Sequence, residues 1–289
     1  MRYASELPRI VFVTCCILPE ADPDEALLID AARQAGLEPE LAAWDDPFVE
    51  WSSYDLAVVR STWNYFTHEE KFRAWIESTN RLTHLLNPAE LMLRTIDKRY
   101  LIEVGNARVP VVPTRVIAPD RESNLAGILE ETGWSRIVFK PTVSAASFMT
   151  SVFNDSEVDK ASEFLHEIHQ LGSAIVQPYL ASVQTGGQVA LVLIDGEFTH
   201  AVSKKPRFDT DEECVSHAME PMTDQFEVAG QVLRLFPEAS LYGQIDLMRL
   251  DDGRWALSEA EFIEPSLFFL QRPVALERFI RAVARYILT

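Results

Sequence analysis

The chain has 289 residues, enough for one large domain or two to three smaller ones, and 47% of them are hydrophobic against 24% charged. The formal net charge of −18 excludes general binding to nucleic acid or to an anionic membrane surface. Three cysteines are too few for a disulfide framework, and we find neither a signal peptide nor an apolar run of about 18 residues, so we expect a cytoplasmic protein.

The first third of the chain alternates strand-like and helix-like segments. This alternation predicts a parallel sheet, whose ligands lie at the carboxyl ends of the strands. For the first helix we expect Asp22 as the N-cap and Gly36 as the end. The predicted elements are strands at 9–14 and 55–60 and helices at 23–36 and 68–79.

Polar residues follow the second of these strands. We predict that Arg60 and Ser61 bind substrate, because a guanidinium at a strand end can hold a carboxylate through two parallel hydrogen bonds. The alternative for Arg60 is an ion pair with an acid in the core. For Trp63 and Tyr65, packing and substrate contact are both open.

The rest of the chain falls into two patterns. Two short helices are predicted in 87–104, and two prolines in 109–114 mark the start of a new unit. From residue 186 the pattern becomes antiparallel, with Asp-Gly turns at 195–196 and 252–253. The other predicted elements are strands at 136–141 and 173–180 and helices at 156–172, 223–236 and 273–287.

The second Asp-Gly turn gives the acidic residues a register. A two-residue turn at 252–253 pairs Asp246 with Glu259 and Gln244 with Glu261, all on one face. Like charges directly opposed repel, whereas a hard divalent cation reverses that sign. We therefore predict a Mg²⁺ site, with Mn²⁺ as an option, and expect Glu259→Gln to relieve repulsion in the metal-free fold. The alternatives are a solvated acidic face or one protonated acid.

A metal beside phosphates also needs cations nearby. The candidates in this sequence are Lys98, Lys140, Lys204, Lys205 and Arg207. Lys140 ends an apolar strand, an unusual place for a solvated lysine. For Lys98 alone, a charge on a helix surface is the alternative.

The order of these motifs resembles the ATP-grasp superfamily over essentially the whole chain. "VRSTWNY", "LLNP", "VPVVPT", "HAVSKKP" and "EAEFIEPSLFF" resemble glutathione-synthetase-like members more narrowly, the group that includes the ligase closing the cycloserine ring from O-ureidoserine. The resemblance implies an α/β plus α+β fold, in which two α+β lobes with antiparallel sheets clasp ATP. It implies an N-terminal α/β substrate domain at 1–105, a small lobe at 106–181 and a C-terminal lobe with the metal site at 182–289.

The resemblance also implies roles for individual residues. Asp246, Glu259 and Glu261 would hold Mg²⁺, and Lys204 and Arg207 would act at the transferred phosphate. Glu264 would face the substrate or support the metal residues. The residues implied to bind ATP are Lys98, Lys140, Ser144, Gln177, Pro178, Tyr179, Leu180 and Lys204.

The activity implied is that of an ADP-forming ligase. It would join a carboxylate to an amine or similar nitrogen through an acylphosphate, on a small amino-acid-like substrate, with no nucleic-acid or membrane partner and with a homo-oligomer left open. The sequence departs from the family pattern in four places. The loop at 142–150 has no glycine, Gln188 stands in place of the usual Glu, and Gln244 in place of the usual Arg. The Arg and the Gly pair that usually follow "KKP" are missing downstream, although Arg207 is close by. A catalytically decayed nucleotide-binding protein and a kinase-like phosphoryl transfer are therefore the alternative hypotheses.

Overall fold

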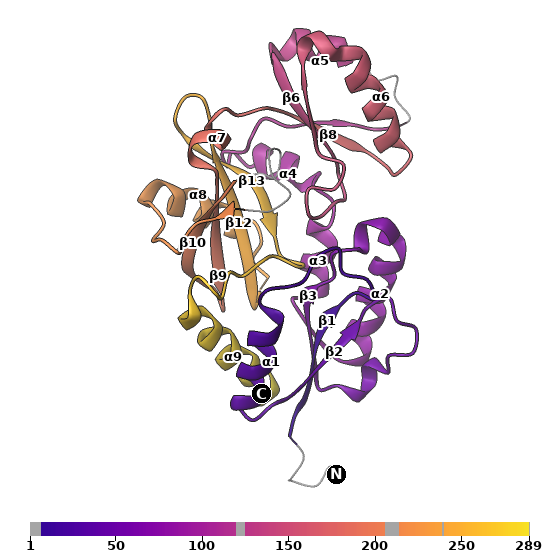
Figure 1. The fold of residues 1–289 in the computed structure, drawn as a ribbon, viewed down its shortest axis with the longest axis vertical. Helices are drawn as coiled ribbons and strands as arrows, with labels where there is room; N and C mark the ends of the chain where they lie inside the picture. Colours follow the sequence, from indigo (N-terminus) through magenta and orange to yellow (C-terminus); the bar gives the residue numbers. More distant parts are fainter. Residues whose placement is uncertain (1–6, 120–124, 206–213, 239, 289) are drawn as a thin grey trace.

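A computed structural model describes residues 7–119, 125–205, 214–238 and 240–288. The residues in these ranges form three sheets: a four-stranded parallel sheet near the N-terminus, a second four-stranded sheet, and a five-stranded sheet (Figure 1). The second and third sheets are antiparallel. The predicted fold class, a parallel α/β unit followed by two α+β lobes, is confirmed. No helix in the described ranges is long and apolar enough to cross a membrane.

The N-terminal sheet has the strand order β2-β1-β3-β4, with every pair parallel. Its central strands β1 (Arg9–Thr14) and β3 (Leu56–Ser61) are buried runs of Val, Ile and Leu, as expected for a sheet covered on both faces. The sequence did not predict β2 (Glu38–Ala43) or β4 (His84–Leu86), because edge strands carry a weaker apolar pattern. The helices of this unit are α1 (Glu25–Gln34) and α2 (Glu69–Leu82), with short 3₁₀ turns η1 (Trp51–Ser53) and η2 (Tyr65–His68).

The ends of α1 differ in part from the prediction. The N-cap is Asp24, not Asp22, because the Asp22 carboxylate accepts the Asp24 N–H at 2.9 Å and the chain turns before the helix begins. Gly36 follows the helix with a φ of 78°, the left-handed conformation that glycine favours at a helix end. The predicted end of the helix is therefore confirmed.

Two short helices, α3 (Ala89–Thr95) and α4 (Tyr100–Asn106), lead from this unit into the second sheet. That sheet has the order β5-β8-β6-β7 and forms the upper lobe in Figure 1. Its strands β5 and β7 and its helix α5 were not predicted. The elements are β5 (Arg115–Ile117), α5 (Leu125–Thr132), β6 (Arg136–Pro141), β7 (Ser151–Asn154), η3 (Asp155–Glu157), α6 (Val158–His169) and β8 (Ala174–Pro178).

The third sheet has the order β11-β10-β9-β12-β13. The predicted hairpin at Asp195-Gly196 is confirmed, and both residues have the positive φ of a tight turn. Helices α8 and α9 lie close to their predicted positions. The elements are α7 (Ser182–Gly186), β9 (Gln188–Ile194), β10 (Glu197–Lys205), β11 (Cys214–Val215), α8 (Thr223–Leu233), β12 (Tyr242–Arg249), β13 (Trp255–Glu261) and α9 (Pro273–Leu288).

The turn between β12 and β13 is one residue longer than predicted and begins one residue earlier, at Asp251. Leu250 N–H donates to Arg254 O at 2.8 Å, so the connection has three residues and the two-residue turn was wrong. Leu247 accordingly lies opposite Leu257. A β-bulge at Ser258 takes up the extra residue, so the predicted register holds beyond it.

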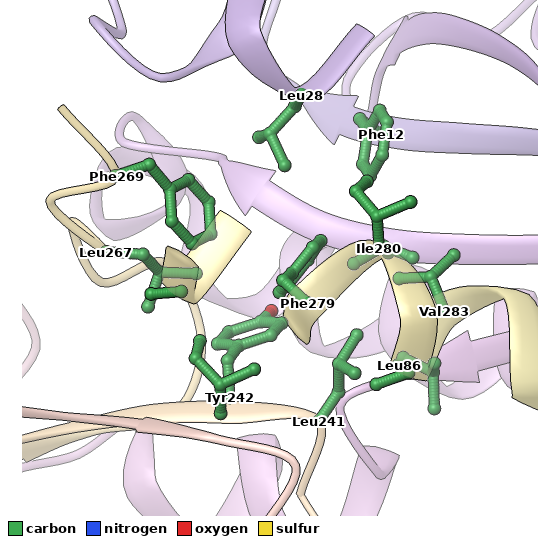
Figure 2. Packing of buried hydrophobic residues seen from close by; sticks show 14 of the residues in the cluster. Phe12, Leu28, Leu86, Leu241, Tyr242, Leu267, Phe269, Phe279, Ile280 and Val283 are labelled. Carbon is green, nitrogen blue, oxygen red and sulfur yellow. The ribbon is translucent and has the colours of Figure 1, made fainter. Parts of the chain in front are cut away.

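The core between the first and third sheets is built around α9. Helix α9 lies beside α1, and its side chains pack with Leu28 and with residues of β1 and β12 (Figures 1 and 2). Tyr242 is the one labelled residue of this cluster with a polar side-chain atom, and the carbonyls of Val59 and Ile263 share the single proton of its hydroxyl. This buried contact ties β12 to the N-terminal sheet.

Candidate active site

The strands β12 and β13 place three acids on one face. Asp246 lies opposite Glu259, and Gln244 lies opposite Glu261, as the sequence predicted. All four line a cavity of about 260 Å³, together with Lys140 and Gln177 of the second sheet and with Trp63 and Tyr65, which follow β3 in the N-terminal unit. The cavity therefore lies where the three parts of the fold meet.

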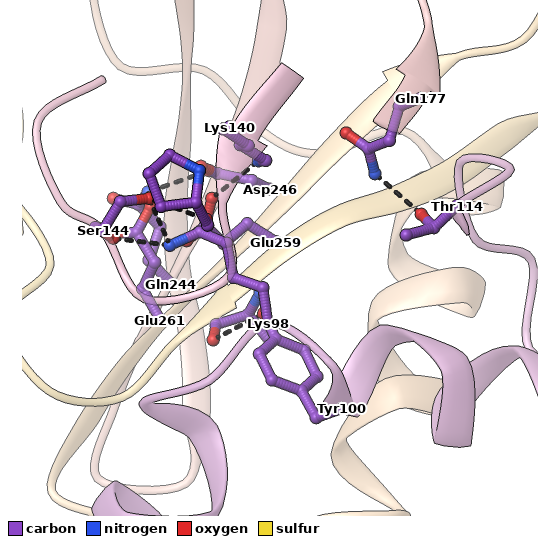
Figure 3. Close-up of polar contacts among 12 residues, drawn as sticks. Lys98, Tyr100, Thr114, Lys140, Ser144, Gln177, Gln244, Asp246, Glu259 and Glu261 are labelled. Atoms are coloured by element: carbon purple, nitrogen blue, oxygen red, sulfur yellow. Dashed lines mark hydrogen bonds and ion pairs between the residues drawn. The ribbon is translucent and has the colours of Figure 1, made fainter. Parts of the chain in front are cut away.

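Two lysines from distant parts of the chain neutralise Glu259. The Lys98 ammonium, just before α4, lies 3.1 Å from its carboxylate, and the Lys140 ammonium at the end of β6 lies 3.4 Å away (Figure 3). Burial alone would raise the pKa of Glu259, but these two cations outweigh it and lower the pKa to about 2. Lys98 is only 4% exposed, so it is not a charge on a helix surface.

The second group of contacts surrounds Asp246. Lys204 on β10 lies 2.8 Å from the Asp246 carboxylate and 3.9 Å from that of Glu261. The Gln244 side-chain amide donates to both carboxylates, at 2.8 Å and 3.1 Å (Figure 3). Burial raises the pKa of Asp246 and that of Glu261, although Lys204 acts in the opposite direction. One ammonium thus faces two carboxyl groups, and the pKa values of both are shifted toward the protonated form.

The three lysines, together with the raised pKa values of Asp246 and Glu261, thus reduce the negative charge of this cluster. Within the described residues, no three His, Cys, Asp or Glu side chains form a group arranged to hold a metal. The expectation that Glu259→Gln would relieve repulsion in the metal-free fold is wrong, because Glu259 is the partner of two lysines and not an uncompensated charge. Carboxylate oxygens remain the donors that Mg²⁺ prefers, so a metal would have to exchange with these lysines.

The chain also resembles known proteins in its sequence and in its structure. Residues 10–87 match the family model of the D-cycloserine synthetase DcsG N-terminal domain. The cycloserine biosynthesis protein DcsG of Streptomyces lavendulae is 30% identical, over 95% of this chain and 97% of that protein. The crystal structure of D-cycloserine synthetase DcsG superposes with a TM-score of 0.86 at 28% identity, covering 96% of this chain and 99% of that one.

The chain belongs to the DcsG family of ATP-grasp ligases. A more distant similarity, to the ATP complex of D-alanine–D-alanine ligase from Bacillus anthracis, concerns the fold. It has a TM-score of 0.70 at 14% identity and covers 97% of both chains. These similarities confirm the predicted resemblance and the activity class, a ligase that forms a carbon–nitrogen bond.

The edge of this DcsG-family cavity is formed by the end of β8. The side chains of Gln177, Pro178, Tyr179 and Leu180 all line it. The Gln177 amide donates to the Thr114 hydroxyl at 2.8 Å, away from the charged cluster (Figure 3). The Tyr179 N–H is occupied by the Arg136 carbonyl at 2.8 Å. The segment predicted to bind adenine is therefore at the cavity, opposite the acids.

The loop after β6 contains no glycine, although several of its residues have the backbone conformation that glycine favours. Ala146, Ser147 and Met149 have φ values of 49°, 58° and 46°, a left-handed region that costs L-residues about 1–2 kcal/mol each. Ser144 opens this loop, and both its carbonyl and its hydroxyl contact the Lys98 ammonium. The glycine-free sequence has thus not removed the turn, and Ser144 and Ser147 line the cavity.

The two predicted substrate residues of the first sheet do not reach the cavity. Arg60 is 3% exposed and donates to the Pro265 carbonyl at 3.0 Å, with Tyr242 beneath its guanidinium. Asp24 interacts electrostatically with Arg60, but among the described residues no ion pair joins the two, so the alternative of an ion pair with a core acid is not observed either. Ser61 is also buried and donates to the Thr14 hydroxyl. Arg207 lies outside the described residues.

For Trp63 and Tyr65 the sequence left packing and substrate contact open, and both residues line the cavity. Glu20, which also lines it, and Asn87 carried little signal in the sequence. Asn87 is fully buried, and its amide nitrogen donates to the carbonyls of Tyr242 and Phe262, both at 2.8 Å. The only local hint for Asn87 is a polar residue between buried Leu86 and a proline.

Proposed function

We propose that this protein is an ADP-forming ligase that binds Mg·ATP between its two antiparallel sheets. It would activate the carboxylate of a small amino-acid-like molecule and join it to a nitrogen nucleophile. Because the DcsG relative is named for cycloserine biosynthesis, we extend the proposal to ring closure, with both groups in one molecule. In this proposal, residues 1–105 bind substrate, 106–181 form the small lobe, and 182–289 hold the metal.

One observation carries the proposal. Lys98, Lys140 and Lys204 come from three separate elements and meet the β12–β13 acids in one cavity. A cluster of ammonium groups and carboxylates is the donor set that a metal–triphosphate requires, because phosphate oxygens take the lysines and the metal takes the acids. A purely structural role would not need so many charged groups around a cavity.

The residues present also fit Mg²⁺ by their chemistry. Asp246, Glu259 and Glu261 supply only carboxylate oxygens, the ligands of a hard cation. When bound there, Mg²⁺ would neutralise charge on the phosphate oxygens during phosphoryl transfer. Lys98 and Lys140 would then be released from Glu259 to face the phosphates.

The rest of the chemistry needs positioning more than reactive side chains. At the far edge of the cavity, residues 177–180 would bind the adenine. Since the Tyr179 N–H is already used, the Leu180 N–H would be the backbone donor to the base. Lys204 would stabilise charge on the transferred phosphoryl group as the substrate carboxylate attacks it. The resulting acylphosphate is open to attack by the nitrogen, and no protein nucleophile is required.

The test is ADP release with Mg²⁺ across a panel of D- and L-amino acids and O-substituted serines, with the product identified by mass spectrometry. We expect ADP and a condensed or cyclised product in equal amounts. ADP with a phosphorylated product alone would favour the kinase-like alternative. No ADP with any panel member would refute the ligase proposal and favour a nucleotide-binding protein, the alternative suggested by Gln244 at the family's usual arginine position.

A further inference from the structure

The segment after β13 is held by a series of side-chain hydrogen bonds. Its four consecutive carbonyls, at residues 262–265, each accept one. In order along the segment, the donors are the Asn87 amide at 2.8 Å, the Tyr242 hydroxyl at 2.8 Å, the Trp63 indole N–H at 3.1 Å and the Arg60 guanidinium at 3.0 Å. This explains the inward direction of Arg60, which holds backbone and not substrate.

These four hydrogen bonds replace the backbone hydrogen bonds that a neighbouring strand would supply. The segment lies beyond the end of β13, so its carbonyls have no sheet partner, and buried carbonyls must be paired. Three of the donors come from the N-terminal unit and one from β12. The segment is therefore fixed to two parts of the fold at once, and the residue at its centre, Glu264, has little backbone freedom.

Glu264 faces the cavity from this segment. It lines the cavity beside Trp63 and Tyr65, and the Tyr65 hydroxyl donates to its carboxylate. Asp246, Glu259 and Glu261 each lie within 4 Å of a lysine. Throughout the described ranges, by contrast, no lysine, arginine or histidine forms an ion pair with Glu264.

The charges around the cavity indicate which group of a substrate the Glu264 carboxylate would face. A substrate carboxylate about to be phosphorylated must lie near the lysine cluster, so the ammonium of an amino acid must point away from it. Glu264 offers an acceptor outside the three acid–lysine contacts. Burial raises the pKa of Glu264 to about 7, with Lys98 acting in the opposite direction, so a cation beside it would restore its charge.

We propose that Glu264 binds the ammonium group of the amino-acid substrate, and that the four carbonyl hydrogen bonds of residues 262–265 position it. This inference rests on the proposed ligase function and makes that function specific for substrates with a free amino group. Arg60, Trp63 and Asn87 are positioning residues in this arrangement, because they act through the segment.

The experiment compares the best amino acid of the panel with its hydroxy-acid analogue, in which a hydroxyl replaces the ammonium. Hydroxylamine is added to capture the acylphosphate, so ADP release reports activation of the carboxylate alone. Glu264→Gln should raise the KM of the amino acid about 10- to 100-fold, the range expected for a hydrogen bond to a charged group. It should leave the KM of the hydroxy acid and the Kd of Mg·ATP unchanged. Glu264→Asp should recover part of the loss.

Two further variants make the outcome decisive. Trp63→Phe removes the indole N–H that holds the Glu264 carbonyl, and it should raise the same KM by a smaller factor. If Glu264→Gln leaves the amino-acid KM unchanged, or raises both KM values equally, the inference is overturned while the ligase function stands. The inference also fails if Glu20→Gln, and not Glu264→Gln, abolishes the preference for the amino acid. No ADP from the wild type with any substrate overturns the ligase function and this inference with it.

Discussion

Glu259→Gln should destabilise the ligand-free protein, although it removes one of three neighbouring negative charges. The Glu259 carboxylate is 23% exposed and pairs with Lys98 and Lys140. Its pKa falls from 4.5 to about 2, which corresponds to about 3 kcal/mol of stabilisation of the ionised form, since one pKa unit is about 1.4 kcal/mol. Loss of the charge also leaves Lys98, which is 4% exposed, without its counter-ion. We expect a loss of about 3 kcal/mol in the free energy of unfolding.

Urea unfolding at pH 7 without ligand measures this loss directly. The matched control is Glu131→Gln. Glu131 lies 3.1 Å from Arg115, the same distance as Glu259 from Lys98, but both members of the Glu131–Arg115 pair are exposed. That variant should lose less than about 1 kcal/mol. A Glu259→Gln protein as stable as the wild type would refute the reasoning and restore simple repulsion among the acids.

The sign of the pH dependence follows from the lowered pKa of Glu259. A carboxyl whose folded pKa is depressed stabilises the protein above its unfolded pKa of 4.5, and that contribution disappears as the pH falls toward 2. The difference between wild type and Glu259→Gln should therefore be constant from pH 7 to about 5 and shrink below 4.5. A difference that grows on acidification would contradict the pairing with lysine.

Three further changes test other parts of the site. Lys204→Met should abolish ADP release. Because it leaves Asp246 and Glu261 without a cation, the urea midpoint of the variant should fall as the pH rises from 5 to 8, and a midpoint independent of pH would contradict the raised pKa values of these two acids. Ala146→Gly should raise the free energy of unfolding by about 0.5–1 kcal/mol, because φ is +49° there, and a loss of stability would contradict that backbone. Gly187→Ala places a Cβ 2.6 Å from the Lys204 carbonyl oxygen at a residue whose φ is 72°. It should lower the free energy of unfolding in urea by more than about 2 kcal/mol and weaken the binding of Mg·ATP in calorimetric titration. A substitution that changes neither quantity would show that β10 shifts freely.

The pairing of the acids could be read from the sequence, and the reason is local. An Asp-Gly turn between two apolar runs determines which residues face each other, so Asp246 and Glu259 were paired correctly. The turn itself was one residue longer than expected. A bulge at Ser258 corrected the register, and bulges depend on how a strand packs, which a periodic pattern does not encode.

The partners of those acids were decided by the tertiary structure alone. Lys98, Lys140 and Lys204 are between 42 and 161 positions from the acids they contact, and no local pattern specifies contacts across such separations. Without them, a metal was the sequence-based explanation for the clustered charge, and Mg²⁺ at this site remains a proposal.

Arg60 shows the same division between sequence and structure. The sequence determined that Arg60 ends a buried strand, because a run of Leu, Ala and Val precedes it. The direction of the Arg60 side chain and the residues that it contacts are not encoded in that run. Both depend on where the segment at 262–265 lies relative to the end of the strand. The Pro265 carbonyl has no strand partner and accepts a hydrogen bond from the Arg60 guanidinium. This carbonyl needs a side-chain donor only because the N-terminal unit and the third sheet pack together and bury it.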